Sequence, residues 1–243
     1  STFMEDWHPI EVKQVKASTL DWFPYASYNH NLRGSDDTDD ANVGLDFIWR
    51  PNSNTQLTGA LNPDFGQVES DDLVVNFSAF ETFVSEKRAF FTENQGLFNS
   101  AQPNEDVVLY TRRIGAGVDK GLLDVDVAAK LTHYGKTVDM GLFAVKEDTS
   151  GESAGGEFIS SRIQRKSNNL AVGHRLTHVT RNFLEREATV QGVDVRWDSS
   201  DKVRVAAQIL HSDIHQKAND NNDYQSVDQQ DYAGWVNWSY TPS

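Results

Sequence analysis

Carboxylates around residues 62–93 are the first candidates for acid–base chemistry in this chain. The four in question are Asp64, Glu69, Glu86 and Glu93. Two neighbouring carboxylates can serve as general acid and general base when their environments differ. However, Lys87 and Arg88 directly follow Glu86, and adjacent opposite charges favour a structural ion-pair network over catalysis. The network predicted here consists of Glu69, Asp71, Glu86, Lys87, Arg88, Glu93, Arg112 and Arg113.

Arg88 is the expected anchor of this network, because its planar guanidinium can hold a carboxylate through two hydrogen bonds. Glu69, Asp71 and Glu93 are the acidic partners available in the same stretch. Five phenylalanines fall between residues 77 and 91, which is unusual for an exposed loop. We therefore expect Phe90 and Phe91 to pack beneath the charged groups.

Metal-ligating patterns are weak. The chain has no cysteine, and its seven histidines are His8, His30, His133, His174, His178, His211 and His215. The pairs 174/178 and 211/215 have the zinc spacing of a helix, but four residues of a strand span about 13 Å. The acidic stretches 35–40 and 217–223 could hold calcium or be solvated loops, and the solvated loop is favoured because no known ligand pattern is present. No metal and no cofactor is predicted.

Composition excludes several function classes. The net charge is −14, without the basic stripe that nucleic-acid binding needs. No serine-hydrolase elbow, zinc-protease motif, phosphate-binding loop or dinucleotide fingerprint occurs. The sequence therefore indicates no particular enzyme, although paired carboxylates keep a hydrolase open as an alternative.

Apolar and polar residues alternate with period two along most of the chain, although mean hydropathy is only −0.57. This pattern predicts an all-β fold with strands of about 8 to 11 residues, the length of a tilted bilayer crossing. The predicted runs are 20–30, 43–50, 57–61, 72–83, 123–132, 138–144, 157–165, 169–179, 188–197, 202–213 and 231–240. We expect 11 or 12 strands in an antiparallel meander that forms part of a transmembrane β-barrel.

The lipid-facing side chains of that barrel are predicted to include Val43, Leu45, Phe47, Leu123, Val125 and Val127. Aromatic clusters at Trp22-Phe23, Trp49 and 235–240 fit either an interfacial girdle or a packed core. Short turns and long polar loops should lie at opposite ends of the barrel. On that basis segment 63–104 is predicted to contain an odd number of crossings, which one strand at about 72–83 would supply.

Three segments carry a family resemblance. They are NPDFGQVE at 62–69 with VVN and EKRAFFTE at 86–93, LDWFPY at 20–25, and YTRRIG at 110–115. Together they resemble a bacterial family of unknown function that joins an N-terminal family-9 carbohydrate-binding module to a C-terminal outer-membrane β-barrel. Ala89 stands where the family commonly has proline, which affects only the local turn.

The resemblance implies a domain organisation and a location. Residues 1–19 would form a linker or docking arm and residues 20–243 a partial barrel, with segment 62–104 at its mouth or in its lumen. The location would be the outer membrane of a Gram-negative bacterium, with lipid and possible glycan or envelope-protein partners. The resemblance also implies a final strand whose last residue is aromatic, whereas this chain ends Tyr240-Thr241-Pro242-Ser243 and Pro242 cannot donate to a β-ladder. The natural protein is therefore expected to continue past Ser243.

Three functions stay open at this point. The first is binding or passage of a solute or glycan, supported by a continuous polar lumen. The second is glycan hydrolysis, supported by two carboxylates about 5 to 9 Å apart in an open cleft. The third is a structural or docking barrel in an envelope complex, supported by a lumen filled with side chains.

Overall fold

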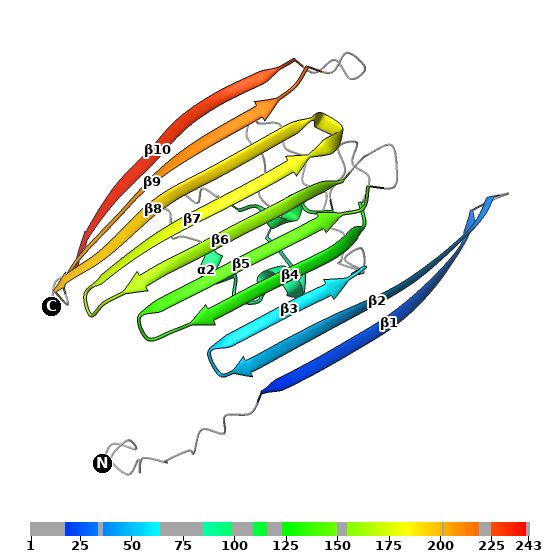
Figure 1. Cartoon of the computed structure of the whole chain (residues 1–243), viewed down its shortest axis with the longest axis horizontal. Coiled ribbons are helices and arrows are strands. Elements are labelled where there is room, and N and C mark those ends of the chain that lie inside the picture. The colour runs from blue at the N-terminus through cyan, green and yellow to red at the C-terminus, as the bar shows by residue number, and fades with distance from the viewer. Residues whose placement is uncertain are drawn as a thin grey trace, which may run out of the picture.

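The computed structural model describes residues 18–33, 36–63, 85–98, 109–115, 123–149, 155–200, 202–218 and 225–241. These residues form ten strands in one antiparallel sheet whose spatial order is the sequence order (Figure 1). The strands are β1 (Thr19–Arg33), β2 (Asp36–Asn52), β3 (Thr55–Leu61), β4 (Val125–Tyr134), β5 (Val138–Glu147), β6 (Gly156–Lys166), β7 (Leu170–Arg181), β8 (Arg186–Ser200), β9 (Val203–Gln216) and β10 (Val227–Tyr240). The predicted all-β antiparallel meander is confirmed.

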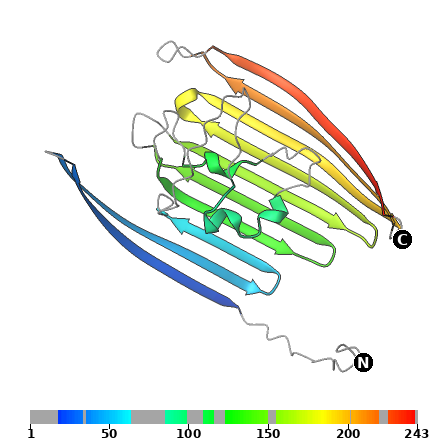
Figure 2. The ribbon, with the colours of Figure 1, turned by 180° about the vertical axis from the view of Figure 1, so that it is seen from behind.

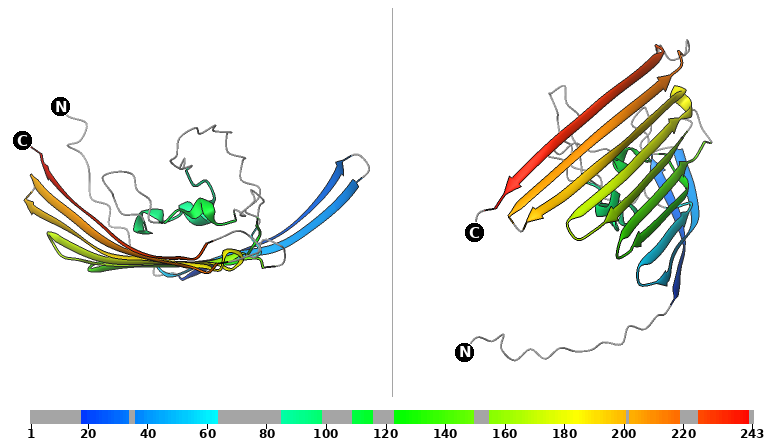
Figure 3. Two further views of the ribbon diagram at one scale, coloured as in Figure 1. Left: turned by 90° about the horizontal axis from the view of Figure 1, so that it is seen from above. Right: turned by 60° about the vertical axis from the view of Figure 1, so that its left-hand side comes forward.

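The sheet is open and curved, so that it has a concave and a convex face (Figure 3). In the described part of the chain, β1 pairs only with β2, and β10 pairs only with β9. Each of these two strands therefore leaves one edge without a neighbouring strand. Among the described residues, no helix is long and apolar enough to span a membrane.

Strands β3 and β4 pair directly, although 63 residues separate Leu61 from Val125. The connections 53–54, 135–137, 167–169 and 201–202 all lie at one end of the sheet. The other end carries the longer connections and also the two-residue connection 34–35 between β1 and β2. The predicted odd number of crossings in segment 63–104 concerns mostly residues outside the described ranges; the described chain leaves β3 and enters β4 at the same end of the sheet. The expected strand at 72–83 lies outside the described residues.

Three short helical segments lie on the concave face (Figure 2). They are α1 (Ala89–Thr92), α2 (Gln95–Phe98) and η2 (Thr111–Arg113). We call the described residues 85–98 and 109–115 the docked segment, and the face that it covers the inner face. A further short helix, η3 (Asn182–Leu184), joins β7 to β8.

The hydrophobic core lies between the docked segment and the middle of the sheet. Its buried members are Ala60, Phe90, Phe91, Leu97, Phe98, Ile114, Val125, Ala128, Phe143, Val145 and Phe158. The ring of Phe143 on β5 lies 5.7 Å from Phe91 and 6.3 Å from Phe98, measured between centroids. Gly141 makes room for this packing, since a β-carbon there would lie 2.7 Å from the Phe98 ring.

The outer face is apolar and exposed, as expected for most of the predicted outward residues. Val43 and Val127 are exposed, and Leu45 and Phe47 share the face of Val43 by alternation along β2. Val125 contradicts the prediction, because it is 1% exposed and belongs to the core. A register shift between Val125 and Val127 interrupts the alternation at this point.

Strand lengths also differ from the sequence prediction. Five strands have 14 to 17 residues, longer than the 8 to 11 expected. Asp36–Asp40, predicted as part of a polar loop, belongs to β2 and pairs with the end of β1. Polar side chains are compatible with strand here because the backbone ladder satisfies the peptide groups regardless of the side chains.

Candidate functional site: the inner face and its docked segment

A buried ion pair fixes the start of the docked segment. The guanidinium of Arg88 donates from Nε to Oε1 and from Nη2 to Oε2 of Glu86, each at 2.8 Å. Their side chains are 7% and 3% exposed. Arg88 also donates to the carbonyl oxygens of Ile114 and Thr111 and lies 4.2 Å from the centroid of the Phe91 ring. One side chain thus joins residues 86–91 to η2.

Glu86 is held as a carboxylate by these contacts. Burial raises the pKa of Glu86, but hydrogen bonds from Arg88 and from the Thr111 hydroxyl outweigh it and bring the pKa below its ordinary value. A general acid needs the opposite change, a raised pKa. The geometry therefore suits a structural contact better than proton donation.

A second buried carboxylate joins the docked segment to the sheet. Glu147 at the end of β5 is 0% exposed. It accepts hydrogen bonds from the backbone N–H of Gly115 at 2.8 Å, from the N–H of Gly156 at 2.7 Å, and from Arg181 at 2.8 Å. Arg181 donates in turn to the carbonyl oxygen of Arg113.

Lys130 on β4 makes a third attachment. Its ammonium group donates to the carbonyl oxygens of Phe90 and Glu93, at the end of α1. A cation is favourable there because the last carbonyls of a helix have no partner within it. Gln56 on β3 adds a hydrogen bond of 2.7 Å to the Glu93 carboxylate.

The predicted site residues are only partly brought together. Glu86 and Arg88 form the first attachment, whereas Glu93 is bound by Gln56 near the third. Lys87 is exposed, Arg112 is partly buried, and Arg113 takes part through its carbonyl oxygen. The candidates Asp64, Glu69 and Asp71 lie outside the described residues, as do most of stretch 1–19 and stretch 219–224.

A pocket of about 280 Å³ opens beside the docked segment, on the inner faces of β4 to β10. Its polar and aromatic lining includes Tyr134, Arg162, Gln164, Asp194, Arg196 and Trp235. Arg162 binds both oxygens of Asp194, one of them at 2.8 Å. The Trp235 indole N–H donates to the Gln208 side chain at 3.1 Å, which fixes the plane of the ring.

Arg175 lies opposite Arg162 in the β6–β7 ladder and is only 4% exposed. Its Nε and Nη2 atoms are buried and have no hydrogen-bond partner in the part of the chain that the structure describes. An unsatisfied buried donor costs about 1–3 kcal/mol, more when it is charged. Arg175 does not line the pocket, so this cost lies within the covered part of the sheet.

Sequence reasoning missed Glu147, Lys130, Arg162, Arg175 and Arg181. Each belongs to an ordinary alternating strand, so nothing local distinguishes it from a solvated residue. The sequence signal that could have indicated them is a charged residue at an inward position of a strand. When that face is covered, a buried charge is stable only if it is paired and hydrogen-bonded.

A protein-family model described as a domain of unknown function (DUF5916) matches residues 17–156, more than half of the 243 residues. The chain belongs to this family. The match covers β1 to β5 and the docked segment. It includes the residues of all three attachments apart from Arg181, which lies beyond the matched range. A search of curated proteins finds no significant match.

Among solved structures, the chain is similar to OmpT, an outer membrane protein of Vibrio cholerae, in its in-vitro folded form. That similarity has 10% identity and a TM-score of 0.40, over 95% of this chain and 100% of that one. A loop L8 deletion mutant of OmpT gives the same identity and TM-score over 93% and 90% of the two chains.

Proposed function

We propose that this chain forms part of the wall of an outer-membrane β-barrel in a Gram-negative bacterium, and that the barrel binds or passes a polar solute of the saccharide class along its inner face. The observation that carries the proposal is the opposite character of the two faces of one sheet. The outer face supports contact with lipid, and the inner face supports contact with a polar ligand.

An apolar band crosses the outer face of the sheet. Its large exposed members include Val43, Leu61, Met140, Leu142, Ile159, Ile163, Val172, Val193, Ile209 and Val236, between 39% and 76% exposed. A water-soluble monomer rarely exposes a contiguous apolar surface of this extent. On β6 the band is bounded by Glu157 at one end and by Arg165 at the other. These charged borders support contact with a hydrocarbon layer of limited thickness.

Tryptophans mark one border of the band. Trp49, Trp197 and Trp238 lie on the outer face near the end with the short turns, and they are 42%, 45% and 66% exposed. Aromatic belts at this level are typical of membrane barrels. Trp235, predicted to belong to the same cluster, instead lies on the inner face.

The two free sheet edges support a barrel with additional strands. An edge that presents unpaired N–H and C=O groups is unfavourable in hydrocarbon, where no water can satisfy them. Closure of the wall beyond β1 and β10 removes both edges.

The pocket beside Trp235 supports the saccharide class. Arg162, Gln164 and Asp194 offer donors and acceptors for hydroxyl groups, and the fixed indole offers an apolar surface for a sugar ring. Its volume of about 280 Å³ lies near the lower end of ligand pockets, about 300 to 1,000 Å³. With Glu86 and Glu93 both bound to the protein, these two candidates do not favour hydrolysis.

Planar-bilayer conductance of the full-length protein tests this function, with neutral and acidic trisaccharides as probes. Reversible, concentration-dependent interruptions of the current are expected for at least one probe. Trp235→Ala should weaken binding about fivefold to tenfold, since loss of ring contact corresponds to roughly 1 to 1.4 kcal/mol.

Trp238→Ala is the matched control, because Trp238 lies on the outer face of the same strand. Its removal should leave the interruptions unchanged. Absence of interruptions for every probe, or equal weakening by the two substitutions, would contradict saccharide binding at this pocket.

A further inference from the structure

The geometry points to a divalent transition-metal site formed by Asp213, His215 and Asp228 at the loop end of β9 and β10. Each residue offers one donor atom, and the three atoms lie within 4.8 Å of one another. The His215 ring lies between the carboxylates, with Nε2 at 2.9 Å from Asp213 and Nδ1 at 3.2 Å from Asp228. This site is independent of the pocket on the inner face.

The β-ladder itself creates the cluster. Asp213 and His215 are two residues apart on β9, so their side chains leave the same face of the sheet. Asp228 is the direct partner of His215 in the β9–β10 register. Side chains opposite each other in an antiparallel pair have β-carbons about 4.5–5.5 Å apart. All three side chains therefore converge without help from a flexible loop.

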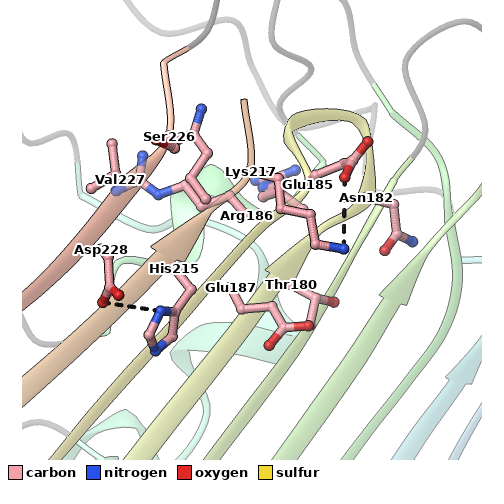
Figure 4. A pocket seen from close by; sticks show the side chains of 12 residues that line it. Thr180, Asn182, Glu185, Arg186, Glu187, His215, Lys217, Ser226, Val227 and Asp228 are labelled. Carbon is pink, nitrogen blue, oxygen red and sulfur yellow. Dashed lines mark ion pairs between the residues drawn. The ribbon is translucent and has the colours of Figure 1, made fainter. Parts of the chain in front are cut away.

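Two further observations indicate a missing ligand. Oδ1 of Asp213 is buried and has no hydrogen-bond partner among the described residues; Nε2 of His215 lies 2.9 Å from it, in an ion-pair contact that lacks hydrogen-bond geometry. A pocket of about 630 Å³ opens beside His215 and Asp228, as Figure 4 shows. A cation can reach the cluster from this pocket and keep a water molecule on its open side.

The donor set selects the class of metal. One imidazole and two carboxylates suit Zn²⁺ with a water as fourth ligand, whereas Ca²⁺ prefers six to eight oxygens. Tetrahedral zinc with bonds near 2.1 Å places its ligand atoms about 3.4 Å apart. A single ion binds one ring nitrogen of His215, so one of the two carboxylates must turn toward the nitrogen that the ion occupies. The side chains of His215 and Asp228 are 55% and 78% exposed, which leaves them free to make this change.

The position on β9 separates the site from the apolar band. Ile209, an exposed residue of the band, is followed on the same face by His211, Asp213 and His215. The cluster thus lies at the polar ends of the long strands, where β10 has only β9 as a described neighbour. A bound ion would link these two strands at an open edge of the sheet.

Calorimetric titration of Zn²⁺ into the metal-free, full-length protein in detergent tests the site. One equivalent should bind saturably, with Ca²⁺ and Mg²⁺ at equal concentration unable to displace it. His215→Gln and Asp228→Asn should each weaken binding at least about tenfold, as expected for loss of one ligand. Heat-modifiable gel mobility verifies that each variant is folded.

His174→Gln is the matched control, because His174 is an exposed histidine on the outer face of β7, away from the cluster. It should bind zinc as the unsubstituted protein does. The proposal is overturned if no saturable equivalent binds, if binding survives His215→Gln in a folded barrel, or if His174→Gln weakens it equally.

Discussion

The inner face of the sheet has two regions with the same alternating sequence and different surroundings. From β3 to β7 its side chains are mostly buried, among them Thr58, Lys130, Phe143, Glu147 and Phe158. From β8 to β10 the inward residues are mostly half-buried or exposed, and the pocket with Trp235 opens there. The docked segment makes the difference, since it covers only the first region.

This contrast separates a scaffold from a surface that is free to bind. In the first region three charged groups hold the docked segment, and an aromatic cluster fills the space beneath it. In the second, charged and aromatic side chains are fixed by each other and still face a cavity. Substitutions in the two regions should therefore affect different measurements.

Removal of Arg88 should have the largest effect. Arg88→Ala leaves Glu86 buried and unpaired, and breaking a buried pair in this way costs about 3–5 kcal/mol. We expect lower thermal stability and less assembled barrel, measured as heat-modifiable gel mobility. Arg88→Lys should restore only part of the loss, because an ammonium group cannot reproduce the two parallel bonds to Glu86.

Arg196→Ala is the control from the open region, since Arg196 is exposed and pairs only loosely with Asp198, at 3.7 Å. It should assemble normally. If Arg88→Ala folds with unchanged thermal stability, the docked segment is not held by this pair and the distinction between the two regions fails.

Neutralising Glu147 should have an intermediate effect. Glu147→Gln keeps the shape of the side chain but removes the charge that balances Arg181, at a cost of about 1.5–3 kcal/mol. Protease cleavage within residues 109–115 of the folded barrel should accelerate, because the single oxygen of glutamine can accept either from Gly115 or from Arg181 and Gly156 but not from both sides. Glu157→Gln, on the exposed outer face of β6, should leave cleavage unchanged; equal acceleration would contradict the assignment.

Acidification should produce the smallest effect. Because the pKa of Glu86 is lowered in the folded protein, its stabilising contribution is complete above its ordinary value of 4.5 and is lost as pH falls through the lower, folded-state value. The stability difference between the unsubstituted protein and Glu86→Gln should be constant at neutral pH and shrink in acid. A difference that grows in acid would have the wrong sign.

Much of the fold follows from the sequence, because alternation alone locates the strands. The predicted runs 157–165, 169–179, 188–197 and 202–213 fall within β6, β7, β8 and β9 except at their borders. Irregularities do not follow from alternation. Val125 lies inside because of a register shift, and Asp36–Asp40 extends β2 despite its polar composition.

The site was less predictable because its contacts join distant residues. Arg88 and Glu86 are two residues apart in the stretch that the sequence singles out, although the acidic partners expected for Arg88 are Glu69, Asp71 and Glu93. Glu147 meets Gly115 and Arg181 across 32 and 34 residues. The cluster at His215 was missed for a different reason. The zinc spacing of a helix picks out histidine pairs four residues apart. On a sheet, the side chains that lie close together belong to residues two apart on one strand and to their direct partners on the neighbouring strand.

Single-cysteine nitroxide labelling tests the two faces most directly, and the absence of native cysteine leaves no background. Labels at Val193 and Ile209 on the outer face should be more accessible to oxygen dissolved in lipid than to a water-soluble nickel chelate. The side chains of Ala206 and Ser212 lie on the inner face by alternation along β9, so labels there should be more accessible to the nickel chelate than to oxygen. Equal accessibility on both faces, or preference of the outer labels for the nickel chelate, would contradict a wall with lipid on one side and a polar interior on the other.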